Sequence, residues 1–200
     1  MDSDVAFTAG SSLLASAYAF ADEAHRGQHD EADGSPYIEH PIAVARLLHE
    51  AGFDEAVVAA GLLHDTVEGT DVEIDDVRRR FGDDVAELVA AMTEPAGVEP
   101  YEARKAAHRA QIRAAGRRAE AVFAADKIAK ASRLRAAIAV HGEEQVGRRM
   151  ENPLDKKVEH YKASLALLEE VAASLPLVPR LRGELARLGE SRARADSTAT

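Results

Sequence analysis

Three side chains in the segment 61–70 have types and spacing that could do chemistry. His64 and Asp65 are adjacent, and Glu68 follows them by four and three residues. On a helix, residues three and four apart share a face, so this spacing predicts that Glu68 lies beside both. An imidazole and a carboxylate can hold a divalent ion, with a second carboxylate above it as a base. Taken alone, the segment fits equally well the end of a helix whose histidine packs on the core and whose acidic side chains are solvated.

Helices must position these residues, because no stretch of the sequence shows the sustained period-2 alternation that is typical of strands. Apolar residues recur instead at helical spacing, and Gly, Pro and Asp residues separate the segments. The sequence predicts helices over 12–28, 75–80, 83–92, 101–115, 118–140 and 154–173. Further helices are expected to begin with Pro41 in a first turn, after Asp54 as N-cap, and after Pro176.

The residue counts restrict the class of protein. The chain has 200 residues, 46% hydrophobic and 30% charged, so it can bury the core of a globular domain. Its 25 basic and 35 acidic residues give a net charge of −10, which argues against a general DNA, RNA or anionic-membrane binder. The absence of cysteine excludes thiolate ligands and thiol nucleophiles. Without a membrane-spanning apolar run or a basic leader, we expect a cytoplasmic protein.

Five blocks of the sequence carry a resemblance to a known family. They are AHRGQ at 24–28, GSPYIEHPIAVA at 34–45, GLLHDTVE at 61–68, FGDDVAELV at 81–89 and ADKI at 125–128. In this order they resemble the HD superfamily of metal-dependent phosphohydrolases, in particular the (p)ppGpp (alarmone) hydrolase domain of RelA/SpoT-type proteins and their small stand-alone relatives. The resemblance implies an all-α fold, a single HD-domain helical bundle.

The same resemblance, with the helix pattern, sets the expected domain boundaries. We expect the HD phosphohydrolase domain at 11–175, after a flexible N-terminus at 1–10. A C-terminal helix at 176–190 is expected to pack on this domain. The polar residues 191–200 are expected to form a disordered tail.

The resemblance implies one divalent ion, held by two imidazoles and two carboxylates, those of His40, His64, Asp65 and Asp126. Such nitrogen and oxygen ligands suit manganese, iron or zinc, and the resemblance favours Mn²⁺. Glu68 matches the family's catalytic carboxylate, and Asp65 would serve both as a ligand and as a proton relay. The implied reaction is attack of metal-bound hydroxide on phosphorus. His25 is not a ligand in the family and is expected to be a packed or surface histidine.

Two substitutions alter the family pattern beside the metal. Gly69 stands where an Asp usually follows the catalytic Glu, which could slow hydrolysis or signal another substrate; Asp71 is the nearest carboxylate that could replace it. Lys130 stands where the family commonly has Asn, one helical turn after Asp126. Its ammonium could point at the metal site and hold a phosphate, or extend into solvent. The neighbouring Lys127 is expected to point elsewhere.

Two further features concern the substrate. The acidic residues of the segment 29–31 stand where alarmone hydrolases carry basic residues that reach the substrate phosphates. Arg133 lies three residues after Lys130 and could extend the basic strip that Lys130 begins. The segment 156–161 resembles the late helix that closes the pocket in small alarmone hydrolases. That likeness maps nucleotide contacts onto Lys157 and Tyr161, with surface solvation and ordinary packing as the alternatives.

The resemblance predicts a divalent-metal-dependent phosphohydrolase that cleaves a nucleotide (pyro)phosphate such as (p)ppGpp, or a related phosphorylated metabolite. The alternative is a catalytically weakened HD domain that serves as a nucleotide-binding sensor or partner-binding module. A purely structural helical protein is disfavoured by the four retained ligands. The expected partner is a small phosphorylated nucleotide, with no DNA, RNA or membrane. The sequence leaves open a homo-oligomer, the physiological metal, the bond cleaved and the effect of Gly69 on turnover.

Overall fold

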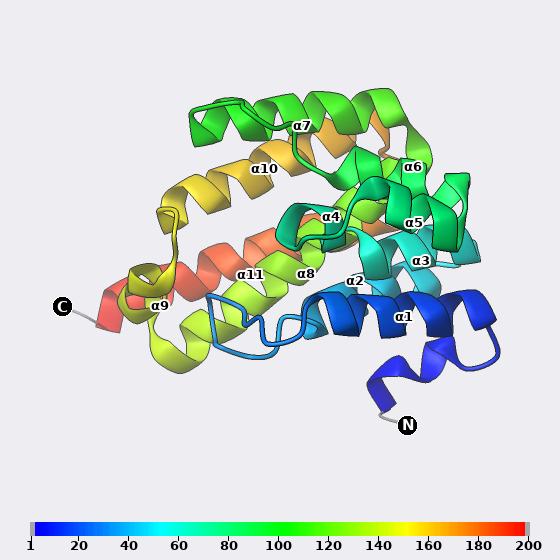
Figure 1. Ribbon diagram of the computed structural model, residues 1–200. Coiled ribbons are helices and arrows are strands. Elements are labelled where there is room, and N and C mark those ends of the chain that lie inside the picture. The colour runs from blue at the N-terminus through cyan, green and yellow to red at the C-terminus, as the bar shows by residue number, and fades with distance from the viewer. Residues whose placement is uncertain (1–2, 199–200) are drawn as a thin grey trace.

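The computed structural model describes residues 3–198, and this part of the chain is helical and contains no strand (Figure 1). The confirmed all-α architecture consists of a short 3-10 helix and a series of α-helices. In chain order these are η1 (Ser3–Thr8), α1 (Ser12–Ala24), α2 (Glu39–Glu50), α3 (Glu55–Leu63), α4 (Thr66–Gly69), α5 (Ile74–Phe81), α6 (Asp83–Met92), α7 (Tyr101–Ala115), α8 (Arg117–His141), α9 (Glu143–Arg149), α10 (Leu154–Val171) and α11 (Leu177–Thr198). None of the described helices is long and apolar enough to cross a membrane.

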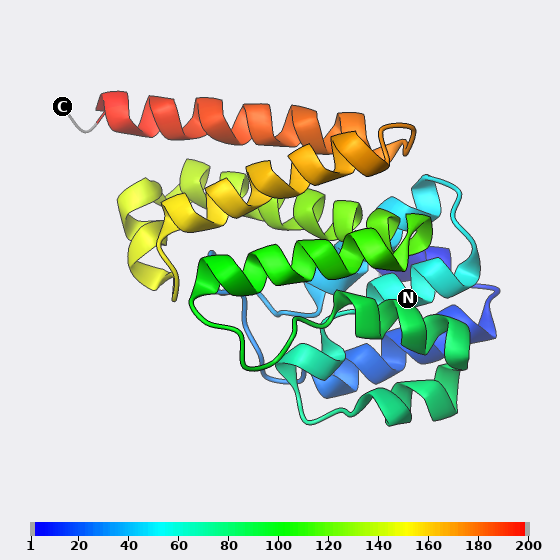
Figure 2. The same cartoon turned by 90° about the horizontal axis from the view of Figure 1, so that it is seen from above.

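Two helices, α3 and α8, form the centre of the core. Every residue of α3 from Val57 to Leu63 is buried, as is every residue of α8 from Ala119 to Ala129. Neighbours pack around both: α1, α2 and α6 contact α3, while α2, α6, α7, α10 and α11 contact α8. Figure 2 shows α11 lying along α8 and α10. A helix enclosed on all sides has no solvent face, so even its polar residues point into protein.

Local sequence signals explain several helix ends. Asp54 caps α3, because its carboxylate accepts hydrogen bonds from the backbone N–H groups of Ala56 and Val57 at 3.1 Å each. The helix predicted over 12–28 ends instead at Ala24, and the chain turns through Gly27, whose φ of +79° suits glycine. The short helices α4 and α9 were not predicted, because four and seven residues carry too little periodic pattern.

Both ends that were expected to be flexible carry helical structure where the chain is described, and residues 1–2 of the first lie outside the described part. Ser3–Thr8 form the 3-10 helix η1, and Val5 is buried against the core. The predicted disordered tail at 191–200 is helical as far as Thr198, and residues 199–200 lie outside the described chain. Arg192 joins this last helix to the domain through ion pairs with Glu143 and Asp155, each at 2.6 Å. The two ion pairs join positions 49 and 37 residues apart, so no local pattern in the tail could reveal them.

Gly61 allows α2 and α3 to approach closely. A Cβ at this position would lie 2.7 Å from Leu48 Cδ1 and 3.2 Å from the Ala45 Cα atom, closer than packed carbons tolerate. The Gly61 carbonyl also accepts a hydrogen bond from the ring of His64, one turn later. The contact between the two helices therefore helps to place a predicted metal ligand.

Replacing Gly61 by Ala should destabilise the protein by about 1–3 kcal/mol, because the added methyl group overpacks the contact between α2 and α3. Gly147→Ala is the matched control, since its Cβ would meet nothing within 4 Å inside α9. There the change should be neutral or stabilising by up to about 1 kcal/mol, as Ala favours helices. Urea unfolding of both variants measures the difference; equal stabilities would contradict the close contact.

Candidate metal centre

Two imidazole nitrogens and two carboxylate oxygens meet where α2, the α3–α4 junction and α8 come together. His40 Nε2 lies 3.3 Å from His64 Nε2 and 3.1 Å from Asp126 Oδ1. His64 Nε2 lies 3.1 Å from Asp65 Oδ2. Ligand atoms of His40, His64 and Asp65 all fall within 4.8 Å of one another. Residues spread over 86 positions of the sequence, from His40 to Asp126, thus present donor atoms to one small volume.

The His-Asp pair occupies a break between two helices rather than the middle of one. Helix α3 ends at Leu63, His64 follows as its C-cap, and Asp65 is the N-cap residue of α4. Glu68 is therefore carried by α4. Its carboxylate accepts a hydrogen bond from the backbone N–H of Glu94 at 3.3 Å. The single helix expected through this motif is interrupted at His64 and Asp65, yet Glu68 still lies close enough to Asp65 for that charge to raise its pKa.

The donor set fits a divalent cation. His64 Nδ1 donates its proton to the Gly61 carbonyl at 2.9 Å, so Nε2 is the nitrogen directed at the cluster. Asp65 and Asp126 outweigh burial and raise the pKa of His64 to about 9, so a cation bound there would take the place of the Nε2 proton. Asp126 Oδ1 is buried, 3.1 Å from His40 Nε2, and the ammonium group of Lys130 lies 2.9 Å from it. Two ring nitrogens that face each other at 3.3 Å, beside such an oxygen, are ligand atoms of the kind that a divalent cation binds.

Nearby cations and hydroxyl groups keep the buried carboxylates ionised. Burial alone would raise the pKa of Asp65, but His64 and Lys130 outweigh it and hold this pKa well below its usual range. Lys127 and Lys130 likewise outweigh burial and hold the pKa of Asp126 well below normal. The Tyr37 hydroxyl donates to Asp65 Oδ2 at 2.5 Å. Tyr37 precedes His40 by three residues at the start of α2, a spacing that could have identified it.

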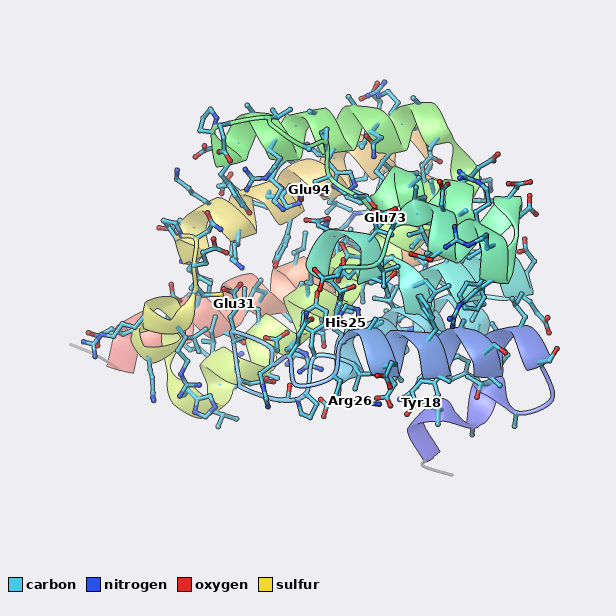
Figure 3. The ribbon with its side chains drawn as sticks, viewed as in Figure 1. Tyr18, His25, Arg26, Glu31, Glu73 and Glu94 are labelled. Carbon is cyan, nitrogen blue, oxygen red and sulfur yellow. The ribbon has the colours of Figure 1, made fainter. Side chains whose placement is uncertain are left out.

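A cavity of about 450 Å³ opens beside the cluster. The loop after α1 forms one side and the loop after α6, with α7, the other; Figure 3 shows Glu31 and Glu94 on these opposite sides. Its aromatic wall residues are Tyr37, Tyr101 and Tyr161, and its cationic ones are Arg104, Lys105, Lys127, Lys130, Arg133 and Lys157. The acids Asp30, Glu31, Glu68, Glu94 and Glu151 also line it, so the cavity carries both signs of charge.

The three predicted substrate contacts all line this cavity. Lys130 Nζ lies 2.9 Å from Asp126 Oδ1 and 3.9 Å from Asp65 Oδ2, so its ammonium points to the candidate metal ligands rather than to solvent. Lys157 forms an ion pair with Glu31, and Tyr161 is buried in the cavity wall. Their positions are compatible with substrate binding, which stays a prediction.

Two other basic residues of α8 differ in their surroundings. Lys127 was expected to point elsewhere, which is wrong: it is buried, its Nζ lies 2.6 Å from Asp126 Oδ2, and it lines the cavity. Because α8 is enclosed at this level, adjacent residues both point into protein. Arg133 lines the cavity too, but its guanidinium already contacts Asp33 and Glu39.

The carboxylate next to Glu68 is Glu94, which the sequence analysis missed. Burial, with the charges of Asp65 and Glu94, raises the pKa of Glu68. Arg104 and Lys105 of α7 hold Glu94 by ion pairs. Glu94 lies 26 residues after Glu68 in a loop, so no local pattern could pair them. Asp71, the carboxylate considered as a replacement at this position, lines a separate hollow with Phe20 and Arg80.

His25 is a packed histidine, which is one of the two alternatives, packed or surface, that the sequence analysis expected. Only 2% of the residue is exposed, and its Nδ1 lies 2.8 Å from Gln28 Oε1. Its ring centroid lies 4.9 Å from that of Tyr37. The histidine therefore supports Tyr37, which in turn contacts Asp65.

Comparison with known proteins places these residues in context. The sequence profile described as "HD domain" matches residues 17–151, more than half of the chain. A segment of 78 residues, 38% of the chain, is 51% identical to guanosine-3′,5′-bis(diphosphate) 3′-pyrophosphohydrolase MESH1 of Homo sapiens and covers 44% of that protein. A segment of 87 residues, 44% of the chain, is 46% identical to a probable guanosine-3′,5′-bis(diphosphate) 3′-pyrophosphohydrolase of Synechocystis sp. but covers only 11% of it.

Two solved structures share the fold. The crystal structure of lmo0812 from Listeria monocytogenes EGD-e has a TM-score of 0.66 and 34% identity, covering 73% of this chain and 96% of that one. A structure described as a metazoan ortholog of SpoT that hydrolyzes ppGpp has a TM-score of 0.64 and 25% identity, covering 94% and 96%. The predicted resemblance to SpoT/RelA-type hydrolases is confirmed.

If the four clustered residues are ligands, the purified protein should bind about one divalent ion per chain. His64→Ala and Asp126→Ala should each weaken Mn²⁺ binding by about 100-fold or more, since each removes a ligand atom outright, and loss of a group that only orients a ligand already costs about 10- to 100-fold. Calorimetric titration measures the affinity, and metal analysis measures the stoichiometry.

The exposed His49→Ala is the control and should bind like the parent. Unchanged Mn²⁺ affinity in the folded Asp126→Ala variant would remove Asp126 from the site.

Proposed function

The chain belongs to the HD-domain family, and we propose that it is a divalent-metal-dependent phosphohydrolase that cleaves a nucleotide (pyro)phosphate such as guanosine-3′,5′-bis(diphosphate). The observation that carries this proposal is the convergence of His40, His64, Asp65 and Asp126 beside a cavity with cationic and aromatic walls. Two relatives that are 46% and 51% identical to the chain over aligned segments of 87 and 78 residues are named for this reaction. A related phosphorylated metabolite is the second candidate substrate.

An HD domain implies a divalent metal, and these four residues would hold it. Their nitrogen and oxygen atoms suit Mn²⁺, which we propose as the ion. When bound, it would act as a Lewis acid on the phosphoryl group and make water a stronger nucleophile. The Gly61 carbonyl and the Tyr37 hydroxyl keep His64 and Asp65 in orientation.

We propose that Glu68 takes the proton from the attacking water. Its carboxylate lines the cavity and has a raised pKa, which makes it a stronger base once ionised. Asp65 would relay a proton as well as bind the metal. The Glu94 N–H fixes the orientation of the Glu68 carboxylate.

The phosphates would lie against the ammonium groups that line the cavity. Lys130 is the first candidate, because its Nζ already neighbours the candidate ligands. Lys157 and Tyr161 of α10 would hold the nucleotide farther from the metal. The net charge of −10 disfavours DNA and RNA as partners, so we propose a small cytoplasmic substrate.

A catalytically weakened nucleotide sensor is the second candidate function. Gly69 supplies no carboxylate beside Glu68, and Glu31 already neutralises Lys157. Both observations reduce the groups available to catalysis and to phosphate binding. A homo-oligomer stays open in either case.

With Mn²⁺, the protein should release pyrophosphate from guanosine-3′,5′-bis(diphosphate). Glu68→Gln should lower kcat by about 100- to 10,000-fold, because an amide cannot accept the water proton. Mn²⁺ affinity should stay within about twofold, since Glu68 is not a proposed ligand. Glu87→Gln, on the exposed face of α6, is the control. Tight nucleotide binding by the parent with no product would instead favour the sensor.

Gly69→Asp should raise kcat by about tenfold or more by returning a carboxylate next to Glu68. The substitution fits, because a Cβ at Gly69 meets only His25 Cε1, at 3.9 Å, and the glycine does not have a positive φ. Gly69→Asn is the uncharged control of the same shape and should leave kcat near the parent value. If the folded Asp variant is no faster than the Asn variant, Gly69 does not limit turnover.

A further inference from the structure

His160 of α10 is a buried histidine that the proposed chemistry does not use. Only 6% of the residue is exposed, yet it lines the same cavity as Lys130 and Tyr161. Its ring lies against Phe123, with 6.4 Å between the ring centroids. Its hydrogen-bond and ring contacts are with Arg109, Phe123 and Tyr161, none of which is a candidate metal ligand.

A contact from α7 fixes which ring nitrogen carries the proton. Arg109 Nη1 lies 2.9 Å from His160 Nδ1. A guanidinium group has only donors, so Nδ1 must accept the hydrogen bond with its lone pair. A neutral ring that accepts at Nδ1 carries its proton at Nε2. Arg109 therefore makes His160 a donor at Nε2.

That donor has no acceptor in the described part of the protein. His160 Nε2 is buried and forms no hydrogen bond there. Buried polar groups of folded proteins are nearly always paired, so an unpaired buried donor on a residue that lines a cavity points to a ligand atom. The ring stays neutral, because burial and the charges of Lys127, Lys105 and Arg109 lower its pKa.

The charges around His160 select the kind of acceptor. Lys105 is paired with Glu94, and Lys127 with Asp126, so two of the three nearest cations are already compensated. Arg109 is turned toward the other ring nitrogen. This part of the wall thus offers a neutral N–H group, which suits a carbonyl oxygen or ring nitrogen of a base better than a doubly charged phosphate.

We propose that His160 is a specificity-determining residue whose Nε2–H donates a hydrogen bond to an acceptor atom of the nucleobase, and that Arg109 is the residue that positions this donor. The claim that the ligand is a nucleotide rests on the proposed function, whereas the assignment of the ring proton to Nε2 does not. The two parts can therefore be tested separately.

The ring nitrogens can be observed directly by ¹⁵N NMR of the 200-residue chain without nucleotide. The His160 signals, assigned by their loss in a His160 variant, should show a protonated Nε2 and an unprotonated Nδ1. Arg109→Met should shift this ring toward a mixture of the two tautomers. A proton on Nδ1, or an imidazolium ring at pH 7, would overturn the proposed donor.

Two substitutions separate the roles of the ring nitrogens. His160→Gln can place an amide N–H near the former Nε2 position, whereas His160→Asn reaches only the Nδ1 position. In Mn²⁺-loaded protein carrying Glu68→Gln, His160→Asn should weaken guanosine-3′,5′-bis(diphosphate) binding by about tenfold, the usual effect of one lost hydrogen bond. His160→Gln should stay within about twofold. Binding of inorganic pyrophosphate should not change in either variant.

Thermal unfolding first establishes that both variants are folded. Normal nucleotide affinity of the folded Asn variant, or an equal loss of pyrophosphate affinity, would overturn the base contact alone. Pyrophosphate binding by the parent without any nucleotide binding would contradict both the base contact and the nucleotide substrate.

Discussion

Two imidazoles and two carboxylates, buried side by side, are the arrangement on which the rest of this structure depends. Ionised groups are costly to bury unless opposite charges or hydrogen bonds compensate them. Here Lys127 and Lys130 compensate Asp126, and Tyr37 donates to Asp65. The apolar centre formed by α3 and α8 supplies the packing that holds these polar groups at fixed separation. A divalent ion would add the remaining compensation, which connects the fold directly to its chemistry.

The cavity beside this cluster combines positions set by different elements. Helix α8 contributes residues at the metal side, whereas α7 and α10 contribute the farther wall. Glu94 and Arg109 act there through other side chains: one contacts Glu68, the other fixes the ring of His160. The cavity wall carries cationic as well as acidic side chains. Because the local cations influence the electric field inside a cavity more than the net charge of the chain does, a chain with a net charge of −10 could still hold an anionic substrate there.

Prediction from sequence succeeded where signals were local. The bounds 83–92 and 101–115 match α6 and α7, because Gly82, Pro100 and Gly116 mark their ends. Sequence prediction failed where distant segments decide: Lys127 points inward because neighbouring helices enclose α8, and the last helix continues past Gly189 to a part where Arg192 pairs with Glu143. The partnership of Glu68 with Glu94 was likewise invisible, since it crosses a loop.

Anomalous diffraction from crystals soaked in Mn²⁺ tests the central claim most directly. We predict one strong peak within bonding distance of His40 Nε2, His64 Nε2 and oxygens of Asp65 and Asp126, with Lys130 displaced toward the cavity. A peak elsewhere, or full ordering of the protein with no manganese at this cluster, would contradict the account.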